Sequence, residues 1–416
     1  MQKNLDHALF VTFAVIFFSL SIPMFFFIEG ALTMGGFGFM YHYLFGCGII
    51  LLGFVYFLLK PEAEYLVSLL KITVIFSLVY IICILWSCVI WSFRFEGSET
   101  IIKGLFENVY VLLAAIIAIA IQLMFSDYSL LLTCYAMSIA NAMIIIPVFL
   151  SDPGEFLSEL SQLVITFGED TGGLMKSIEI HDLTFTFGMF FLHALLDKNV
   201  KGRKQILVLS AIFSITGLKR IAAAGIALGA VLFWGLNQTK KYKQFVYLIC
   251  EIVIIGSFLY LTAVHYGLFD YLETIGLDTK GRNLIYGYIN GLFDINPGFM
   301  GNGLGFSSKS WNLPFYSKLF QDAYHNEFLR MYVELGFWGY FVWIIFHLPF
   351  RIWYLFRNHG KTVGLMYAAS AAYCYITYAT DNTYYYFYLN FAVFLTMFST
   401  CARKPKEGIH EIIETA

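Results

Sequence analysis

One histidine of this sequence stands where its chemistry could be used. His325 directly precedes an apolar run and follows a segment rich in aromatic residues. An imidazole can act as a general base near neutral pH, provided that a nearby carboxylate fixes its tautomer and orientation. Glu327, Asp322 and Asp381 are the candidate carboxylates. A polar interface residue without a catalytic role is the alternative interpretation of His325.

Two arginines could hold an anion. Arg282 precedes an apolar periodic stretch, and its planar guanidinium can grip two oxygens of a diphosphate, which a lysine cannot do. Arg220 follows Lys219 in a tight turn at the expected start of a helix, where free N–H groups favour a phosphate. Alternatively, Arg282 pairs with Asp278 or Asp294 at a helix start. Lys219 and Arg220 could instead snorkel to the lipid headgroups.

Further polar side chains belong to the same candidate site. Asp381 and Asn382 stand between the last two apolar runs and could orient a base, bind a sugar hydroxyl or form a simple turn. His181 lies near the outer end of another apolar run. The supporting or sugar-binding candidates are Tyr324, Asn326, Glu327, Arg330, Asp381 and His181.

The sequence lacks the motifs of a dedicated metal or nucleotide site. It contains no D-x-D, no H-E-x-x-H, no Walker loop and no G-x-G-x-x-G before a strand. We therefore expect no metal and no cofactor, and the leaving group must come with the substrate. The net charge of -2 and the lack of a basic block give no reason to expect a nucleic-acid partner. The seven cysteines form no C-x-x-C pair and are expected to be buried apolar residues.

Membrane-spanning helices must position these residues. The chain is 59% hydrophobic and only 13% charged, far from the roughly 25% charged residues of globular proteins. Nearly unbroken apolar runs such as 72–90 exclude an outer-membrane barrel, whose strands alternate over roughly ten residues. We predict an all-α polytopic membrane protein of about twelve transmembrane helices. The expected spans are 8–28, 38–59, 70–93, 105–125, 128–150, 178–197, 203–217, 220–236, 243–265, 327–350, 363–379 and 384–401.

The basic residues indicate the orientation. Twelve spans put both termini on one side, and a cytoplasmic N-terminus places sixteen of the 26 Lys and Arg residues in inner loops or at inner span ends. The first run lacks a small-residue cleavage signature, so we expect it to be retained as a span. We therefore predict a multi-pass protein of the bacterial cytoplasmic (inner) membrane with both termini cytoplasmic.

This topology leaves two long outer segments. In 151–177, the spacing of the apolar residues suits a short amphipathic helix at the membrane surface. The second, 266–326, is a large periplasmic or extracellular loop between the ninth and tenth spans, rich in glycine and aromatic residues. A loop of about sixty residues usually carries function or is disordered, and its aromatic content argues against disorder. No internal repeat is evident, and we expect 1–416 to form a single integral membrane domain.

The order of these features resembles the O-antigen polymerase and O-antigen ligase superfamily of bacterial envelope glycosyltransferases. The resemblance covers about 120 residues of the C-terminal half. Arg282 and Gly298 are separated by fifteen residues, similar to the R-x15-G pattern attributed to polymerases. The stretch that begins at His325 is similar to the H-N-x9-G-x-x-G pattern attributed to ligases. Lys219 stands before Arg220 where serine or threonine is commoner, so its role is open.

The resemblance implies metal-independent sugar transfer at the outer face of the inner membrane. The donor would be a glycan on undecaprenyl diphosphate, and the diphosphate would be the leaving group. Arg220 and Arg282 match the arginines proposed to clamp that group, with Lys219 beside them. His325 matches the proposed catalytic base that takes the proton of the acceptor hydroxyl. Membrane lipids and a chain-length regulator would be further partners.

Polymerase is the favoured member of this class, because the aromatic loop suits stacking on several sugars and because polymerases are the more numerous and divergent group. Such an enzyme would join repeat units of the O-antigen, a surface polysaccharide of lipopolysaccharide biosynthesis. A ligase would transfer the same donor to the lipid A-core oligosaccharide, and a capsule or exopolysaccharide polymerase belongs to the same class. A transporter of the lipid-linked glycan and a structural membrane scaffold are the alternatives from other classes.

Overall fold

The computed structural model describes residues 38–166, 181–216, 220–277, 279, 281–310 and 324–402. Within these residues the secondary structure is helical throughout, and no strand is formed. A helix satisfies its backbone hydrogen bonds within one segment, which is what a chain in hydrocarbon requires. The predicted all-α class is confirmed. The run 8–28 and the residues Lys219, Asp278 and Asp322 lie outside the described residues.

Several helices have the length and apolar composition of membrane spans. Shorter apolar helices of the described chain are Gly46–Leu59, Leu183–Leu196 and Phe387–Cys401. All seven cysteines are free; four are buried as predicted, whereas Cys47 and Cys88 are exposed on their helices. Five helical stretches are long and apolar enough to cross a bilayer: Ala63–Arg94, Ser98–Ser151, Arg220–Asn237, Tyr242–His265 and Glu327–Asn358.

The described chain divides into two compact units. Unit 1 comprises 1–73, 114–219 and 391–416, and unit 2 comprises 74–113 and 220–390. Three helices contribute residues to both units: α3 (Ala63–Arg94), α4 (Ser98–Phe125) and α18 (Phe387–Cys401).

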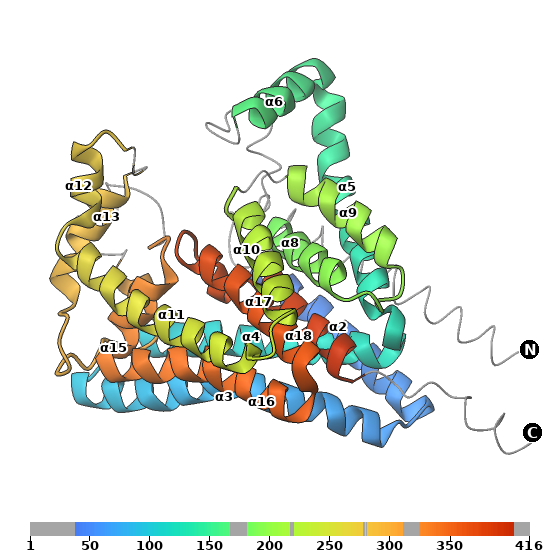
Figure 1. The fold of residues 1–416 in the computed structure, drawn as a ribbon, viewed down its shortest axis with the longest axis horizontal. Helices are drawn as coiled ribbons and strands as arrows, with labels where there is room; N and C mark the ends of the chain where they lie inside the picture. Colours follow the sequence, from blue (N-terminus) through green and yellow to red (C-terminus); the bar gives the residue numbers. More distant parts are fainter. Residues whose placement is uncertain are drawn as a thin grey trace, which may run out of the picture. The chain divides into compact units, whose positions relative to one another are not determined.

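In unit 1, helices α8 and α9 pack together and α5 packs against both (Figure 1). Arg203 closes the turn between α8 and α9, because its Nε donates to the carbonyl of Ala194 at 2.7 Å at the end of α8. A cation there also complements the helix dipole. The helices that lie wholly in this unit are α2 (Gly38–Leu59), η1 (Ser126–Tyr128), α5 (Ser129–Ser151), α6 (Pro153–Thr166), α8 (His181–Leu196) and α9 (Arg203–Thr216).

The predicted amphipathic helix after residue 151 is present as α6. Its Phe156 is buried and stacks edge-on against Phe149 of α5, whereas Leu157 is exposed. The apolar spacing that predicted this helix therefore gives one face that packs on α5 and one that leaves apolar surface uncovered.

Unit 2 holds the eighth to eleventh predicted spans and the segment between the ninth and the tenth. That segment, 266–326, contains short helices within its described residues. The helices of this unit are α10 (Arg220–Asn237), α11 (Tyr242–His265), α12 (Leu268–Thr274), α13 (Arg282–Ile289), η2 (Asn290–Leu292), α14 (Phe306–Ser310), α15 (Glu327–Ile345), the π-helical η4 (Phe346–Phe350), α16 (Arg351–Asn358), α17 (Gly360–Tyr378) and η5 (Thr383–Tyr385).

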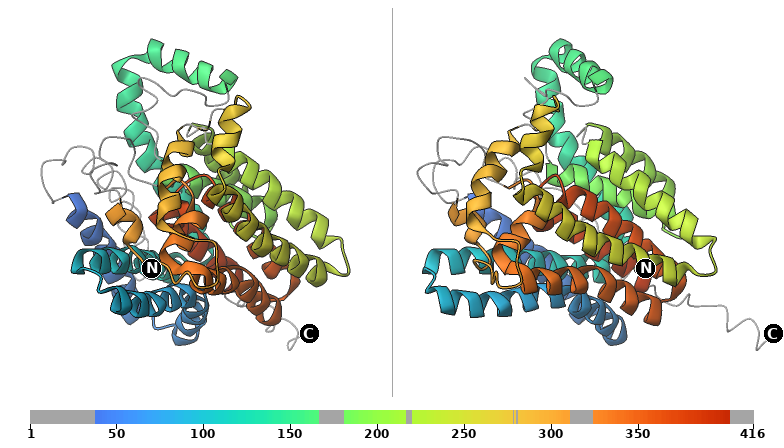
Figure 2. Two further views of the ribbon diagram at one scale, coloured as in Figure 1. Left: turned by 90° about the vertical axis from the view of Figure 1, so that its left-hand side faces the viewer. Right: turned by 60° about the vertical axis from the view of Figure 1, so that its left-hand side comes forward.

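Helices α10 and α17 lie side by side and run antiparallel (Figures 1 and 2). Lys361, at the start of α17, donates to the carbonyl of Asn237, the last residue of α10, at 2.6 Å. Further along the pair, a Cβ on Gly225 would lie 2.8 Å from the ring of Tyr373. The small residues at the start of α10 thus allow the close helix approach expected from the sequence.

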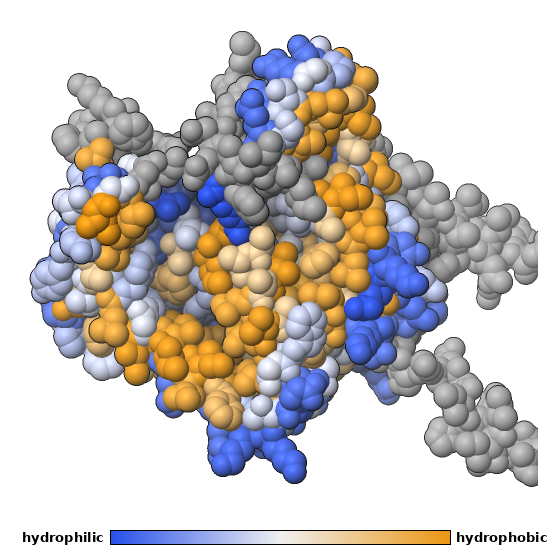
Figure 3. Space-filling view, turned by 45° about the horizontal axis from the view of Figure 1, so that its top comes forward, coloured by the Kyte–Doolittle hydropathy of each residue, from blue (hydrophilic) through white to orange (hydrophobic). Residues whose placement is uncertain are grey.

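The apolar surface of unit 2 is partly uncovered. Four side chains that recur every three or four residues along α11 are between 49% and 64% exposed: Leu248, Ile252, Ile255 and Leu259. Figure 3 shows hydrophobic residues gathered in broad areas of the surface. An exposed apolar helix face of this kind suits contact with lipid.

Helix α15 is interrupted at Gly336, whose backbone is non-helical (φ 69°, ψ -174°). The glycine loop, residues 298–305, fills the break. Gly303 N donates to the carbonyl of Glu334 at 2.7 Å, so a carbonyl released by the break finds a partner. A Cβ at position 336 would lie 2.2 Å from the backbone of this loop, so glycine is required there.

Candidate functional site

His325 and Asp381 face each other at the start of α15. His325 Nδ1 lies 3.7 Å from Asp381 Oδ1, and the two side chains are 28% and 14% exposed. The backbone of His325 is left-handed (φ 49°), and its N–H donates to Asn382 Oδ1 at 3.0 Å. The dipeptide Asp381-Asn382 therefore contacts both the ring and the backbone of the histidine. Of the two candidate carboxylates that the structure describes, Asp381 and Glu327, it is Asp381 that lies beside the imidazole.

The carboxylate of Asp381 is itself held in place. Its Oδ1 accepts hydrogen bonds from the backbone N–H of Asn382 at 2.8 Å and from the hydroxyl of Tyr386 at 3.1 Å. A fixed carboxylate beside Nδ1 favours the tautomer in which Nδ1 carries the proton and Nε2 is free to accept one. The pair therefore has the geometry of an oriented general base.

Arg282 reaches the same turn. It is the first residue of α13, after Gly281 in the left-handed conformation (φ 76°). Its Nη2 donates to the carbonyl of Thr380 at 3.0 Å, next to Asp381. No ion pair joins Arg282 to Asp294, both of which the structure describes. The structure thus brings one predicted anion-binding arginine to the turn that holds the histidine.

Arg220 lies at the same end of unit 2. It is the exposed first residue of α10, and the antiparallel register of α10 and α17 sets it level with Tyr378, the last residue of α17. Asp381 follows three residues later. The N-terminal end of α10 and the turn after α17 therefore lie at one end of the helix pair. The second predicted arginine belongs to this end, while Lys219 lies outside the described residues.

Asn326 and Tyr324, two of the supporting candidates, are buried. Asn326 caps α15, because its Oδ1 accepts from the N–H of Leu329 at 3.1 Å, and its Nδ2 donates to the hydroxyl of Tyr260 at 2.8 Å. Tyr286 of α13 lies nearby, and burial raises the pKa of its hydroxyl, which stays neutral at physiological pH. These residues fix the start of the helix that presents His325.

The first turns of α15 take part in a largely buried charged cluster, which we call the Arg330 cluster and define as Glu107, Glu327, Arg330 and Glu334. Arg330 Nη2 bonds Glu107 Oε2 at 2.5 Å, and its other nitrogens lie 3.8 Å from Glu327 and Glu334. Glu327 and Glu334 are fully buried. The guanidinium carbon also lies 4.2 Å from the ring centre of Tyr385.

The sequence reasoning named Glu327 and Arg330 but missed Glu107 and Glu334. Glu334 could have been found from its spacing, because residues at i, i+3 and i+7 share a helix face. Glu107 could have been noticed as a carboxylate inside an apolar run, which is rare without a partner. Its actual partner, 223 residues away, was not predictable from spacing.

His181, the last supporting candidate, is the first residue of α8 in unit 1, and its side chain lies outside the description. Comparisons with protein-family models, with curated proteins and with solved structures found no match to this chain. In the described part of the chain, no group of three or more His, Cys, Asp or Glu residues could hold a metal ion.

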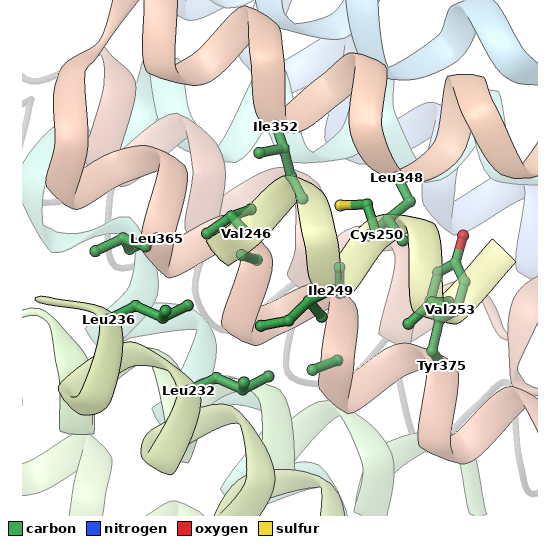
Figure 4. A pocket seen from close by; sticks show the side chains of 13 residues that line it. Leu232, Leu236, Val246, Ile249, Cys250, Val253, Leu348, Ile352, Leu365 and Tyr375 are labelled. Atoms are coloured by element: carbon green, nitrogen blue, oxygen red, sulfur yellow. The ribbon is translucent and has the colours of Figure 1, made fainter. Parts of the chain in front are cut away.

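Unit 2 also contains a small apolar cavity of about 50 Å³ (Figure 4). Side chains of α10, α11, α17 and the stretch from η4 to α16 line it, and nearly all of them are aliphatic. Three alanines of α17 leave the space open. The lining residues are Leu232, Leu236, Val246, Ile249, Cys250, Val253, Leu348, Ile352, Leu365, Ala368, Ala371, Ala372 and Tyr375.

The candidate site brings the imidazole of His325 and the guanidinium of Arg282 to the same turn. A histidine oriented by a carboxylate can deprotonate a hydroxyl, and a guanidinium beside the same turn can stabilise an anion that forms next to it. The apolar cavity and the uncovered face of α11 belong to the same unit.

Proposed function

We propose that the protein is an O-antigen (surface polysaccharide) polymerase. It joins oligosaccharide repeat units carried on undecaprenyl diphosphate by glycosyl transfer at the outer face of the bacterial inner membrane. The observation that carries the proposal is the meeting of His325, Asp381 and Arg282 around one turn, Thr380 to Asn382. The resemblance of the C-terminal half to the O-antigen polymerase and ligase superfamily supports the same reaction class.

The proposed transfer uses these residues in one displacement. His325 Nε2 takes the proton of the acceptor hydroxyl while that oxygen bonds to the anomeric carbon of the donor. The bond between this carbon and the diphosphate oxygen breaks, and its electron pair leaves with undecaprenyl diphosphate. Arg282 and Arg220 stabilise the charge of the departing diphosphate. Attack from the face opposite the leaving group inverts the anomeric centre.

A lipid-linked donor fits the chemistry of unit 2. An isoprenoid chain is apolar, and the exposed apolar face of α11 is a surface that such a chain can contact. Burial of each methylene group there contributes about 0.8 kcal/mol. In this proposal twelve spans place both termini in the cytoplasm and the His325 end of unit 2 outside, beside the large loop 266–326.

A ligase is the second candidate, because the H-N-x9-G-x-x-G pattern includes Gly336, which the structure uses for the break in α15. The deciding experiment gives purified protein in lipid only lipid-linked repeat units. Longer chains support the polymerase. Product that forms only after lipid A-core is added supports the ligase. Absence of glycosidic bond formation with either acceptor refutes the enzyme and leaves a transporter of the same lipid.

A further inference from the structure

The Arg330 cluster contains more negative than positive groups. Three carboxylates face one guanidinium, and Glu327 and Glu334 are fully buried. With every group ionised the cluster would carry two uncompensated negative charges. Burying an unpaired charge costs more than a nearby cation returns, so such groups take up a proton instead.

The three carboxylates differ in their partners. Glu107 forms the short ion pair with Arg330, and Glu334 Oε1 accepts from the backbone N–H and the hydroxyl of Ser307 at 3.0 and 2.6 Å. Each of these two carboxylates therefore has a close polar partner. Among the residues that the structure describes, neither carboxylate oxygen of Glu327 has a hydrogen-bond partner, and the nearest cationic nitrogen is 3.8 Å away. Of the three carboxylates, Glu327 is therefore the one whose ionised form is least stabilised by neighbouring groups.

We propose that Glu327 is a proton-binding site, occupied at neutral pH, at the centre of the Arg330 cluster. The charged and titratable groups that face it are Arg330 and Glu334 of α15, Glu107 of α4, and Asp381 and Tyr385 of the turn after α17. Of these groups, Arg330 alone favours an ionised Glu327. The helix N-terminus also favours an anion there, but only modestly, whereas full burial opposes it strongly.

A proton fits this site better than a metal ion. Within the described residues, no three carboxylate, imidazole or thiol groups converge as metal ligands. The guanidinium of Arg330 lies among the carboxylates and would repel a second cation. A proton needs no such shell, because it binds covalently to one oxygen of Glu327.

Protonation of Glu327 would affect binding of the donor diphosphate, a consequence that rests on the proposed function. Glu327 follows His325 by two residues, and it lies within electrostatic range of Asp381. An ionised Glu327 would add a negative charge beneath the place where the donor diphosphate is to bind. The bound proton removes that repulsion.

Infrared difference spectroscopy of the full chain in lipid tests the site without any substrate. The spectrum of the wild type minus that of Glu327→Gln should contain, at neutral pH, the carbonyl band of a protonated carboxyl that shifts in D2O. The same difference taken with Glu107→Gln should contain only the bands of an ionised carboxylate. Absence of the protonated band from the Glu327 difference would overturn the proposal.

Two further measurements guard against a variant that does not fold. In wild-type protein alone, the band should be present at neutral pH and disappear as the pH is raised, and a band of constant intensity would contradict a dissociable proton. Binding of an undecaprenyl-diphosphate lipid should weaken about tenfold at alkaline pH in the wild type but not in Glu327→Gln. If the infrared result holds and this lipid does not bind, the proton site stands and the proposed donor fails.

Discussion

Two buried arginines on one helical stretch, Arg330 and Arg351, lie in opposite kinds of surroundings. Arg330 faces three carboxylates and one tyrosine ring. Arg351, which is 2% exposed, has no carboxylate within ion-pair distance in the described chain. It donates to the hydroxyl of Tyr367 at 3.1 Å and to the carbonyl of Phe76, and its guanidinium lies 4.7 Å from the Phe76 ring centre.

The difference separates a titratable region from a fixed one. The partners of Arg330 can gain or lose protons, so the charge of that region depends on pH and on what binds nearby. The partners of Arg351 are a carbonyl, a hydroxyl and aromatic faces, which keep the same charge at every physiological pH. Tyr367 in turn donates to the carbonyl of His347 at 2.8 Å, so Arg351 ties α16, α17 and α3 together. Arg330 offsets negative charge in its cluster, whereas Arg351 holds packed helices together.

In the proposed mechanism, the largest expected effect is on the turnover rate and comes from replacing His325. Replacing His325 with alanine should lower turnover by about a thousandfold, because the base is lost, while binding of the lipid diphosphate is retained. Chain-length analysis of products and a lipid-binding assay on the same preparation provide the measurement. The matched control is His359→Ala, in the turn after α16. A normal ladder of products from the His325 variant would remove the base assignment.

The second largest effect is expected on the free energy of unfolding, when the cation of the Arg330 cluster is removed. Arg330→Ala should reduce the free energy of unfolding by about 4 kcal/mol at neutral pH, because it leaves buried carboxylates without a cation. Acidification should restore part of this loss, since protonated carboxyls no longer need the cation. Thermal unfolding in detergent between neutral and acidic pH measures both effects. A loss that is independent of pH would contradict the description of this region as titratable.

Arg351→Ala should cost somewhat less, about 3 kcal/mol, through lost packing and unpaired polar partners. Here the loss should be the same at acidic and neutral pH. Arg357→Ala, an exposed arginine on the same helix α16, is the control and should change stability by less than about 0.5 kcal/mol. Recovery of the Arg351 variant in acid would mean that a carboxylate faces it after all.

The smallest effect is expected at Arg282. Arg282→Lys keeps the charge but loses the planar fork, so activity should fall by about tenfold if the diphosphate is held through two oxygens. The ratio of turnover to Michaelis constant measures it, with Lys243→Arg as a remote control. Unchanged activity would leave Arg282 an electrostatic or structural role, such as its bond to Thr380.

The sequence predicted the helices well because the length of an apolar run largely determines a span. The predicted ranges 220–236 and 243–265 correspond to Arg220–Asn237 and Tyr242–His265. The tenth predicted span, 327–350, was too short, because the helical path continues through the π-helical turn at Pro349 to Asn358. An arginine at the end of an apolar run signals an interface, so the burial of Arg351 by distant aromatic residues was not foreseen.

The sequence identified individual residues of the candidate site but not which of them contact each other. Residue chemistry selected His325 and Arg282, yet only the packing of α15 against the turn after α17 shows Asp381 beside the imidazole, although Glu327 is closer in sequence. Likewise, the ion pair between Glu107 and Arg330 depends on where two distant helices meet. The number of predicted spans, their orientation and the single membrane domain stay predictions.

The glycine loop has a consequence for how disturbances spread within unit 2. Gly303 and Ser307 are bonded to Glu334, in the middle of α15, while His325 stands at the beginning of the same helix. Because both contacts end on Glu334, a substitution at Gly303 or Ser307 should disturb the break in α15 and the Arg330 cluster together.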